Sequence, residues 1–150
     1  MKTLHAALLP LACILAIGPL GAAAAGAPTI VMAGQENYGP APKPYPAQAQ
    51  MAVLSGDPAK SGSQYTVRLK LADGTKIAAH AHGDTENVTV IRGTLMVGVG
   101  SSFNASNMIA LTPGSYVSIP AGAPHYAMAK GETVVQVNGI GPASMTLTGQ

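Results

Sequence analysis

Near its middle the chain reads Gly74-Thr75-Lys76-Ile77-Ala78-Ala79-His80-Ala81-His82-Gly83-Asp84-Thr85-Glu86. Residues two apart on a β-strand point to the same face, so a strand through this stretch would project His80 and His82 together. The pair Gly83-Asp84 then favours a bend, which can bring Glu86 back beside the two imidazoles from the start of the next strand. The stretch therefore predicts a strand that carries two imidazole ligands, with a carboxylate close by.

The remaining histidines of the chain are His5 and His125. His125 follows a turn rich in proline and glycine, residues 120–124, and would reach the same site from a separate strand. His5 and the only cysteine, Cys13, both lie in the amino-terminal segment, so the rest of the chain offers only nitrogen and oxygen ligands. Three neutral imidazoles and one carboxylate suit zinc, copper, iron, nickel or manganese. Four such ligands would leave two positions of an octahedral ion open.

Short runs with the period of strands follow one another from residue 64 onward. Residues 64–71 alternate apolar with polar side chains, which is the pattern of a half-buried strand. The other predicted strands are 76–81, 88–91, 95–99, 108–111, 116–119, 134–137 and 145–147. Glycine or proline separates these runs at predicted turns, among them Arg92-Gly93, where a hairpin is expected, and Lys130-Gly131. Many short strands in succession predict an all-β sandwich or barrel.

Two separate motifs resemble those of the cupin superfamily. The stretch 74–86, with six residues between Glu86 and Gly93, resembles the first motif without a gap. Gly114, then Pro120-Ala121-Gly122, then His125 resemble the second motif. That motif commonly closes with an asparagine four residues after its histidine, where this chain has Ala129. The resemblance spans residues 64–137 and implies a small, single-domain, type-2-like cupin with one jelly-roll β-barrel.

The resemblance also implies the metal ligands His80, His82, Glu86 and His125. Dioxygenases, isomerases and decarboxylases among the cupins share this ligand set, so it leaves the reaction open. The first hypothesis is an enzyme that uses a divalent ion (Fe, Mn, Zn, Ni or Cu) to act on a small organic molecule. The second is a non-catalytic module that binds a small ligand or a metal, and the third is a purely structural β-domain. Cupins often pair through their sheets, which implies a homodimer.

Four further residues are candidates for the lining of a cavity beside the metal: Tyr126, Gln136, Met96 and Arg68. Arg68 could pair with an anionic substrate, although its alternation with Val67 and Leu69 is also that of a surface charge. Gly98 and the many alanines are interpreted as leaving room in the barrel for a small ligand. A small-molecule ligand is therefore the expected partner.

The amino-terminal third of the chain divides into two predicted segments before the barrel. Residues 1–25 have a charged start, a short apolar stretch and an Ala-x-Ala boundary, the parts of a secretory signal peptide. Prolines and a glycine interrupt the apolar stretch, which favours a cleaved signal over a membrane anchor. Residues 26–50 form a proline-rich extended arm, either packed along the domain or docking a partner. Residues 51–150 form the cupin barrel.

The predicted location is the periplasm or the outside of the cell, with no membrane attachment after removal of the signal. The whole chain carries 8 Lys+Arg and 6 Asp+Glu, a net charge of +2. Removal of the signal, which contains Lys2, lowers that net charge to +1. So small a charge is not the pattern of a chain that binds nucleic acid or anionic membranes.

Overall fold

The computed structural model describes residues 26–149, so the predicted signal peptide, residues 1–25, lies outside the described part of the chain. Within the described range the regular secondary structure consists almost entirely of strands. They are β1 (Gly39–Pro40), β2 (Ala49–Gly56), β3 (Gln64–Leu71), β4 (Lys76–Ala81), β5 (Glu86–Val99), β6 (Ile109–Leu111), β7 (Tyr116–Ile119), β8 (His125–Ile140) and β9 (Thr146–Leu147). A short 3-10 turn, η1 (Ala105–Asn107), precedes β6. Among residues 26–149, no helix is long and apolar enough to span a bilayer.

Strand β3 illustrates how the sequence pattern builds the core. Its residues alternate between the outside and the interior, with Tyr65, Val67, Leu69 and Leu71 buried. Because successive side chains of a strand point to opposite faces, the apolar residues of each strand can share one interior. Burial of one valine or leucine side chain contributes about 1.5–3 kcal/mol. The predicted all-β fold is confirmed, and the predicted strand 64–71 has the bounds of β3.

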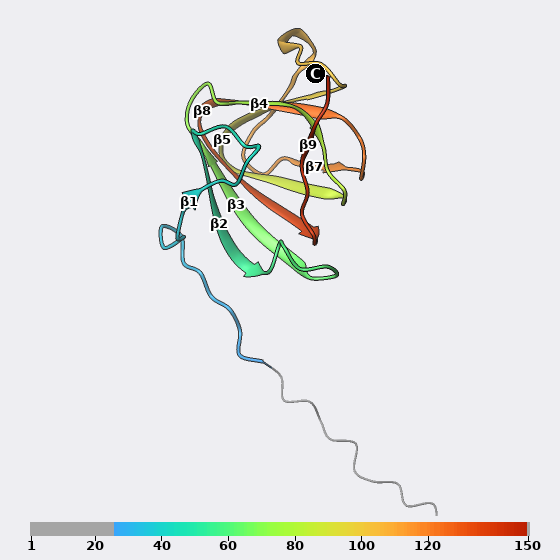
Figure 1. Ribbon diagram of the computed structural model, residues 1–150. Helices are drawn as coiled ribbons and strands as arrows, with labels where there is room; N and C mark the ends of the chain where they lie inside the picture. Colours follow the sequence, from blue (N-terminus) through green and yellow to red (C-terminus); the bar gives the residue numbers. More distant parts are fainter. Residues whose placement is uncertain (1–25, 150) are drawn as a thin grey trace, which may run out of the picture.

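Strands β5 and β8 are long and bent, and the sheet curls around them (Figure 1). The carboxyl-terminal part of β8 pairs with β3, and its first residues pair with β4. Strand β5 runs antiparallel to both parts of β8 and also pairs with β6 and β7. Strands β1 and β2 extend the sheet beyond β3, and β9 extends it beyond β4. This curled antiparallel sheet confirms the predicted jelly-roll barrel.

The predicted hairpin at Arg92-Gly93 and the predicted turn at Lys130-Gly131 are wrong, because both pairs lie inside long strands, β5 and β8. The pairing of β5 with β8 shifts register on either side of Arg92, which is the mark of a β-bulge. Gly93 and Gly131 have φ angles of 76° and 73°, values that favour glycine. The two glycines therefore kink the paired strands without reversing the chain.

The proline-rich segment lies against the barrel before β2 begins. The earliest described residues, blue in Figure 1, run away from the barrel. The carboxylate of Glu36 then forms an ion pair with the guanidinium of Arg68 on β3. The ammonium group of Lys70, also on β3, lies 4.5 Å from the centre of the Tyr38 ring. Strand β1 follows at once and pairs with β2, so the segment is attached to the sheet on both sides of Tyr38.

Candidate metal centre

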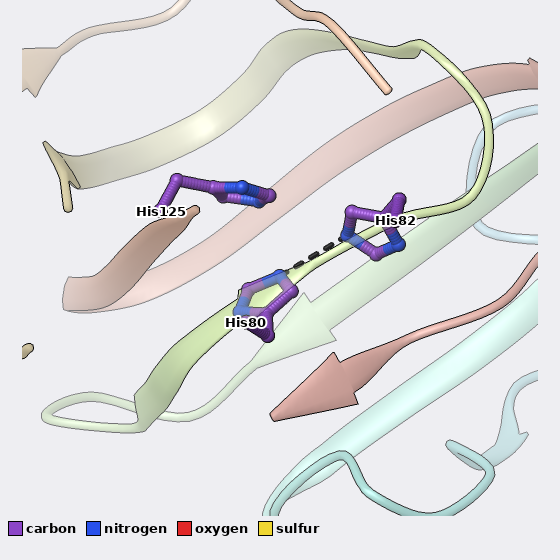
Figure 2. Close-up of side chains that lie close together, drawn as sticks. All are labelled: His80, His82 and His125. Atoms are coloured by element: carbon purple, nitrogen blue, oxygen red, sulfur yellow. Dashed lines mark hydrogen bonds between the residues drawn. The ribbon is translucent and has the colours of Figure 1, made fainter. Parts of the chain in front are cut away.

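Three buried histidines meet inside the barrel (Figure 2). His80 lies in β4, His82 lies just beyond the end of that strand, and His125 is the first residue of β8. His80 and His125 are direct partners in the pairing of the two strands. The exposed fractions of the three residues are 3%, 9% and 4%, so nearly all of each ring is removed from solvent. The predicted convergence of the three histidines is confirmed.

A bulge in β4 turns His80 toward the interior. Ile77 lines the interior, so regular alternation would point Ala79 inward and His80 outward. The register between β4 and β8 shifts between Ile77 and His80, and both residues line the same cavity. Bulges commonly re-aim a side chain in this way near functional sites. The position of the first imidazole thus depends on an irregular strand.

Each imidazole is held by a backbone carbonyl group. The Nδ1 atoms of His80, His82 and His125 lie 2.6 Å from Ala78 O, 2.7 Å from Ser144 O and 3.0 Å from Ala123 O, respectively. A carbonyl oxygen can only accept a hydrogen bond, so each Nδ1 carries the proton and donates it. The Nε2 atom of each neutral ring then carries a lone pair. Metal-binding histidines in proteins are usually oriented by such a contact.

The geometry of the ring nitrogens fits a bound cation. One nitrogen from each histidine lies within 4.8 Å of those of the other two. The Nε2 atoms of His80 and His82, joined by the dashed line in Figure 2, are 3.1 Å apart. With the protons on Nδ1, both of these Nε2 atoms are acceptors, and a cation beside them would satisfy both. The donor set of three neutral imidazoles is one that divalent transition metals prefer.

Glu86 is the first residue of β5 and lies beside the histidines with an exposed fraction of 7%. Its Oε2 atom is 3.5 Å from Nε2 of His82 and 3.4 Å from Nε2 of His125. The structure therefore brings together all four residues that the sequence motifs singled out. Three of them, the histidines, have ring nitrogens close enough to share an ion.

Burial and mutual contact shift the pKa values of these groups. Burial lowers the pKa of His80 to about 4, so the ring stays neutral near pH 7. Burial also acts to lower the pKa of His125, but the carboxylate of Glu86 and the carbonyl of Ala123 raise it above its usual value. Conversely, burial acts to raise the pKa of Glu86, and its contacts with His125 and His82 bring the pKa below its usual value. A carboxylate beside three imidazoles is thus kept ionised.

Two spaces adjoin the histidines. The inner cavity has a volume of about 30 Å³ and is lined by His80, Glu86 and His125 together with apolar core residues. That volume holds little more than one water molecule. The outer pocket has a volume of about 300 Å³ and reaches His82 and Glu86. This volume lies at the lower end of the range of pockets for small organic ligands.

The four other predicted site residues do not line either space. Arg68 forms its ion pair with Glu36 on the outer face of the sheet, and Gln136 is its partner across the β3–β8 pairing. Met96 lies between the inward-facing Leu95 and Val97 and pairs with Met128. Because successive residues of a strand face opposite ways, each of these side chains points away from the interior. Their assignment to the cavity is corrected accordingly.

Tyr126, the fourth of these residues, follows His125 directly and therefore faces the other way. Its exposed fraction is 1%, its ring packs against Phe103, and its hydroxyl donates a hydrogen bond to the carbonyl of Asn104. A Cβ atom at Gly98 would lie only 2.2 Å from the Tyr126 ring. Gly98 thus makes room for Tyr126 and not, as the sequence had indicated, for a ligand.

Two residues near the site were missed from the sequence. The carbonyl of Ser144 orients His82, and its hydroxyl accepts a hydrogen bond from the backbone of Gly83. Tyr45, in the proline-rich segment, lines both the inner cavity and the outer pocket. An aromatic residue among prolines was the one available signal for Tyr45, whereas a carbonyl group leaves no signal in the sequence.

Comparison with known proteins agrees with this geometry. A family model described as a cupin domain matches residues 67–139. No curated protein matches the chain. Among solved structures, the polyketide cyclase RemF from Streptomyces resistomycificus is similar with a TM-score of 0.65 and 14% identity, over 81% of this chain and 85% of that chain. An RmlC-like cupin from Shewanella frigidimarina has a TM-score of 0.57 and 15% identity, over 76% and 91%.

A third solved structure, the salicylate 1,2-dioxygenase from Pseudoaminobacter salicylatoxidans, has a TM-score of 0.56 and 14% identity, over 69% of this chain and 30% of that chain. At these identities the solved structures establish the fold alone. The family match is more specific, because residues 67–139 contain both sequence motifs and all four residues that gather in the barrel. Residues 67–139 of the chain form a cupin domain.

Proposed function

We propose that this cupin binds one divalent metal ion and uses it to hold a small organic molecule that enters through the outer pocket. The observation that carries this proposal is the orientation of the three imidazoles. Each ring donates its Nδ1 proton to a backbone carbonyl, which leaves the Nε2 lone pairs free for a metal. An apolar core would not require three histidines with this common orientation.

We assign the ligands as His80, His82, His125 and Glu86. Burial of Glu86 and its distances of 3.4 and 3.5 Å to two imidazoles support its inclusion as the fourth ligand. One carboxylate would leave a divalent site with a charge near +1, so an oxygen-rich or anionic ligand would be favoured there. A divalent ion bound by this set supplies Lewis acidity toward oxygen atoms of the ligand.

The proposal has two forms, an enzyme and a non-catalytic binding module, which differ in what happens to the molecule after it binds. Cupins with this fold serve different functions, so the fold does not select a reaction. A pocket of about 300 Å³ that reaches two of the proposed ligands gives a small molecule direct access to them, which both forms require. A dioxygenase, an isomerase and a decarboxylase would all use such access, and a binding module would return the molecule unchanged.

Metal analysis of the purified protein tests the proposal. We expect about one equivalent of a transition metal in protein prepared without chelator. The variants His125→Ala and Glu86→Gln should bind Co²⁺ at least about 10-fold more weakly than the wild type, because the first removes a ligand and the second replaces the carboxylate by a neutral amide. Glu132→Gln is a matched control, since Glu132 pairs with Arg92 on the exposed surface. Its affinity for Co²⁺ should equal that of the wild type.

Two results would contradict the proposal. The first is wild-type protein that holds no metal as purified and binds none in a Co²⁺ titration. The second is full metal binding by a folded double variant, His80→Ala with His125→Ala, which would place the metal elsewhere. Oxygen uptake and product formation with phenols, diketones and sugar acids then separate an enzyme from a binding module.

We also propose that the protein acts outside the cytoplasm, on the basis of the sequence of residues 1–25. Amino-terminal sequencing of protein from the periplasm or the medium should begin near Gly26. A mature protein that retains Met1, or a wholly cytosolic pool, would contradict this location.

A further inference from the structure

The outer pocket and the inner cavity share a wall that contains only two polar residues. The residues common to both spaces are Tyr45, Glu86 and Val137. Glu86 is already part of the proposed metal site, and Val137 offers only a hydrocarbon surface. A molecule that lies in the outer pocket and reaches toward the metal would therefore pass the phenol of Tyr45.

The backbone around Tyr45 forms a closed loop that fixes its position. The amide of Ala41 donates a hydrogen bond to the carbonyl of Ala49, which closes the loop at its base. Within the loop, the amide of Tyr45 donates to the carbonyl of Pro42, and the amide of Ala49 donates to the carbonyl of Pro46. The ring of Tyr45 packs against the hydrophobic core. Tyr45 is thus held over the site by its own segment.

The hydroxyl of Tyr45 is available as a hydrogen-bond donor. The hydroxyls of Tyr65, Tyr116 and Tyr126 donate to Asp84, Asn87 and the carbonyl of Asn104. Within residues 26–149, the hydroxyls of Tyr38 and Tyr45 make no such bond, and Tyr45, which is only partly buried, is the one of the two that lines the pocket. Burial, with a smaller effect of the Glu86 carboxylate, raises the pKa of Tyr45, so the group keeps its proton.

The remaining walls of the outer pocket define what kind of molecule fits. Apolar side chains line much of it: Pro42, Met51, Pro58, Ala59, Val67, Val137, Ala143 and Met145. Lys43 is the one lysine or arginine among the lining residues. A small molecule with an apolar body and an anionic oxygen group would match this surface, because the hydrocarbon part finds apolar contacts and the oxygen group finds donors.

We propose that Tyr45 is a ligand-binding residue of this site, which donates a hydrogen bond to an oxygen of a small organic oxyanion bound at the metal. The proline-rich segment is then one wall of the binding site and not merely a tether. This inference rests on the proposed metal site. It adds the class of molecule that is bound, a small oxyanion with an apolar part, and a residue that selects it.

Titration of Co²⁺-loaded protein with acetohydroxamate, followed by the visible absorption of cobalt, tests the inference. Acetohydroxamate is a small oxyanion that binds metals through oxygen. We expect Tyr45→Phe to weaken its binding about 10-fold, because one hydrogen bond to a charged group is lost. Co²⁺ affinity should stay unchanged. Tyr116→Phe is the matched control, since Tyr116 is 59% exposed on another part of the surface, and it should bind the probe as the wild type does.

The outcomes separate this inference from the proposed function. If wild-type protein does not retain Co²⁺, the metal site itself is overturned, and the inference is overturned with it. If Co²⁺ is retained but acetohydroxamate does not bind to the wild type, the assigned class of ligand is wrong. If Tyr45→Phe binds the probe as tightly as the wild type, the metal site stands and the role of Tyr45 is overturned. A Tyr45 that only packs would give this last result, because phenylalanine preserves the ring.

Discussion

The histidine rings show how residue-scale contacts determine chemistry, because a backbone carbonyl fixes the tautomer of each one. His80 has a further property, since burial lowers its pKa to about 4. In an unfolded chain the same group has a pKa of about 6.5. Between these two values the unfolded state binds more protons than the folded state. The free energy of unfolding of the metal-free protein should therefore fall by up to about 2 kcal/mol between pH 7 and pH 5.

Urea denaturation of EDTA-treated protein at both pH values measures this effect, with His80→Gln as the comparison. The wild type should lose more stability than the variant on acidification. His125 acts in the opposite direction, because its raised pKa favours the folded state at low pH and this contribution is lost as pH rises. The pKa of Glu86 is lowered from its usual value of 4.5, so its contribution to the free energy of unfolding is lost mainly below that pH. Both groups are present in the two proteins, so the difference reports on His80. Equal pH dependence would contradict the prediction.

Close packing at a single glycine gives a second residue-scale prediction. A Cβ atom at Gly98 would lie 2.2 Å from one atom of the Tyr126 ring, which is itself buried against Phe103. We expect Gly98→Ala to reduce the free energy of unfolding by about 1–3 kcal/mol, the usual cost of overpacking. Gly39→Ala is the control, because no atom lies within 4 Å of its Cβ position. Chemical denaturation should show a loss for Gly98→Ala alone, and equal losses would contradict this account.

At the scale of elements, the bulges in β5 and β8 bend the two strands around which the sheet curls. Gly93 combines a φ of 76° with a Cβ position only 2.4 Å from the carbonyl oxygen of Glu132. Gly131 has a φ of 73° but open space at its Cβ position. Gly131→Ala should therefore cost about 1–2 kcal/mol from backbone strain. Gly93→Ala adds a clash with backbone atoms and should cost about 1–3 kcal/mol more.

Thermal or urea unfolding of the two glycine variants measures this difference. The pair is well matched, since both residues lie in the same pairing of β5 with β8 and both have the left-handed conformation. A Gly93→Ala variant that is as stable as Gly131→Ala would mean that the strands shift to accept the new methyl group. The bulge would then not be a fixed feature of the fold.

The same bulges explain where prediction from the sequence reached its limit. Alternation in residues 64–71 predicts β3 correctly, because one face of that strand is buried and the other is not. Arg92-Gly93 has the local signature of a turn, and a positive φ serves a turn and a bulge equally well. A turn and a bulge are distinguished only by whether the partner strand, here β8, continues past this point. The path of β8 depends on residues far away in the sequence. The bulge that turns His80 inward was unforeseen for the same reason.

For the site, the two motifs predicted which residues gather, because their spacing carries information on strands and turns together. The motifs did not predict which residues line the cavity. His125 points inward from β8, so Tyr126, the next residue of the strand, points to the other face. Tyr45 could not be placed either. The position of Tyr45 beside the site depends on the path of the proline-rich segment, which has little regular structure of its own. That path depends in turn on contacts such as the ion pair of Glu36 with Arg68.

At the scale of the whole molecule, the proposed metal would join segments that are far apart in the chain. Its ligands come from the end of β4, the start of β5 and the start of β8, and the carbonyl of Ser144 supports one of them from beyond β8. An ion that binds the folded state alone stabilises it in proportion to the logarithm of its concentration relative to its Kd. Bound metal should therefore act as a link across the barrel.

Removal of the metal should consequently lower the melting temperature of the protein. An ion present at about 1,000 times its Kd contributes about 4 kcal/mol, which corresponds to roughly 10 °C or more for a domain of this size. Calorimetry with excess Co²⁺ and with EDTA measures the shift. Glu132→Gln, on the surface, should keep the full shift, whereas His125→Ala should lose most of it because a ligand is missing. Equal melting temperatures of the wild type in Co²⁺ and in EDTA would mean that no ion links these strands.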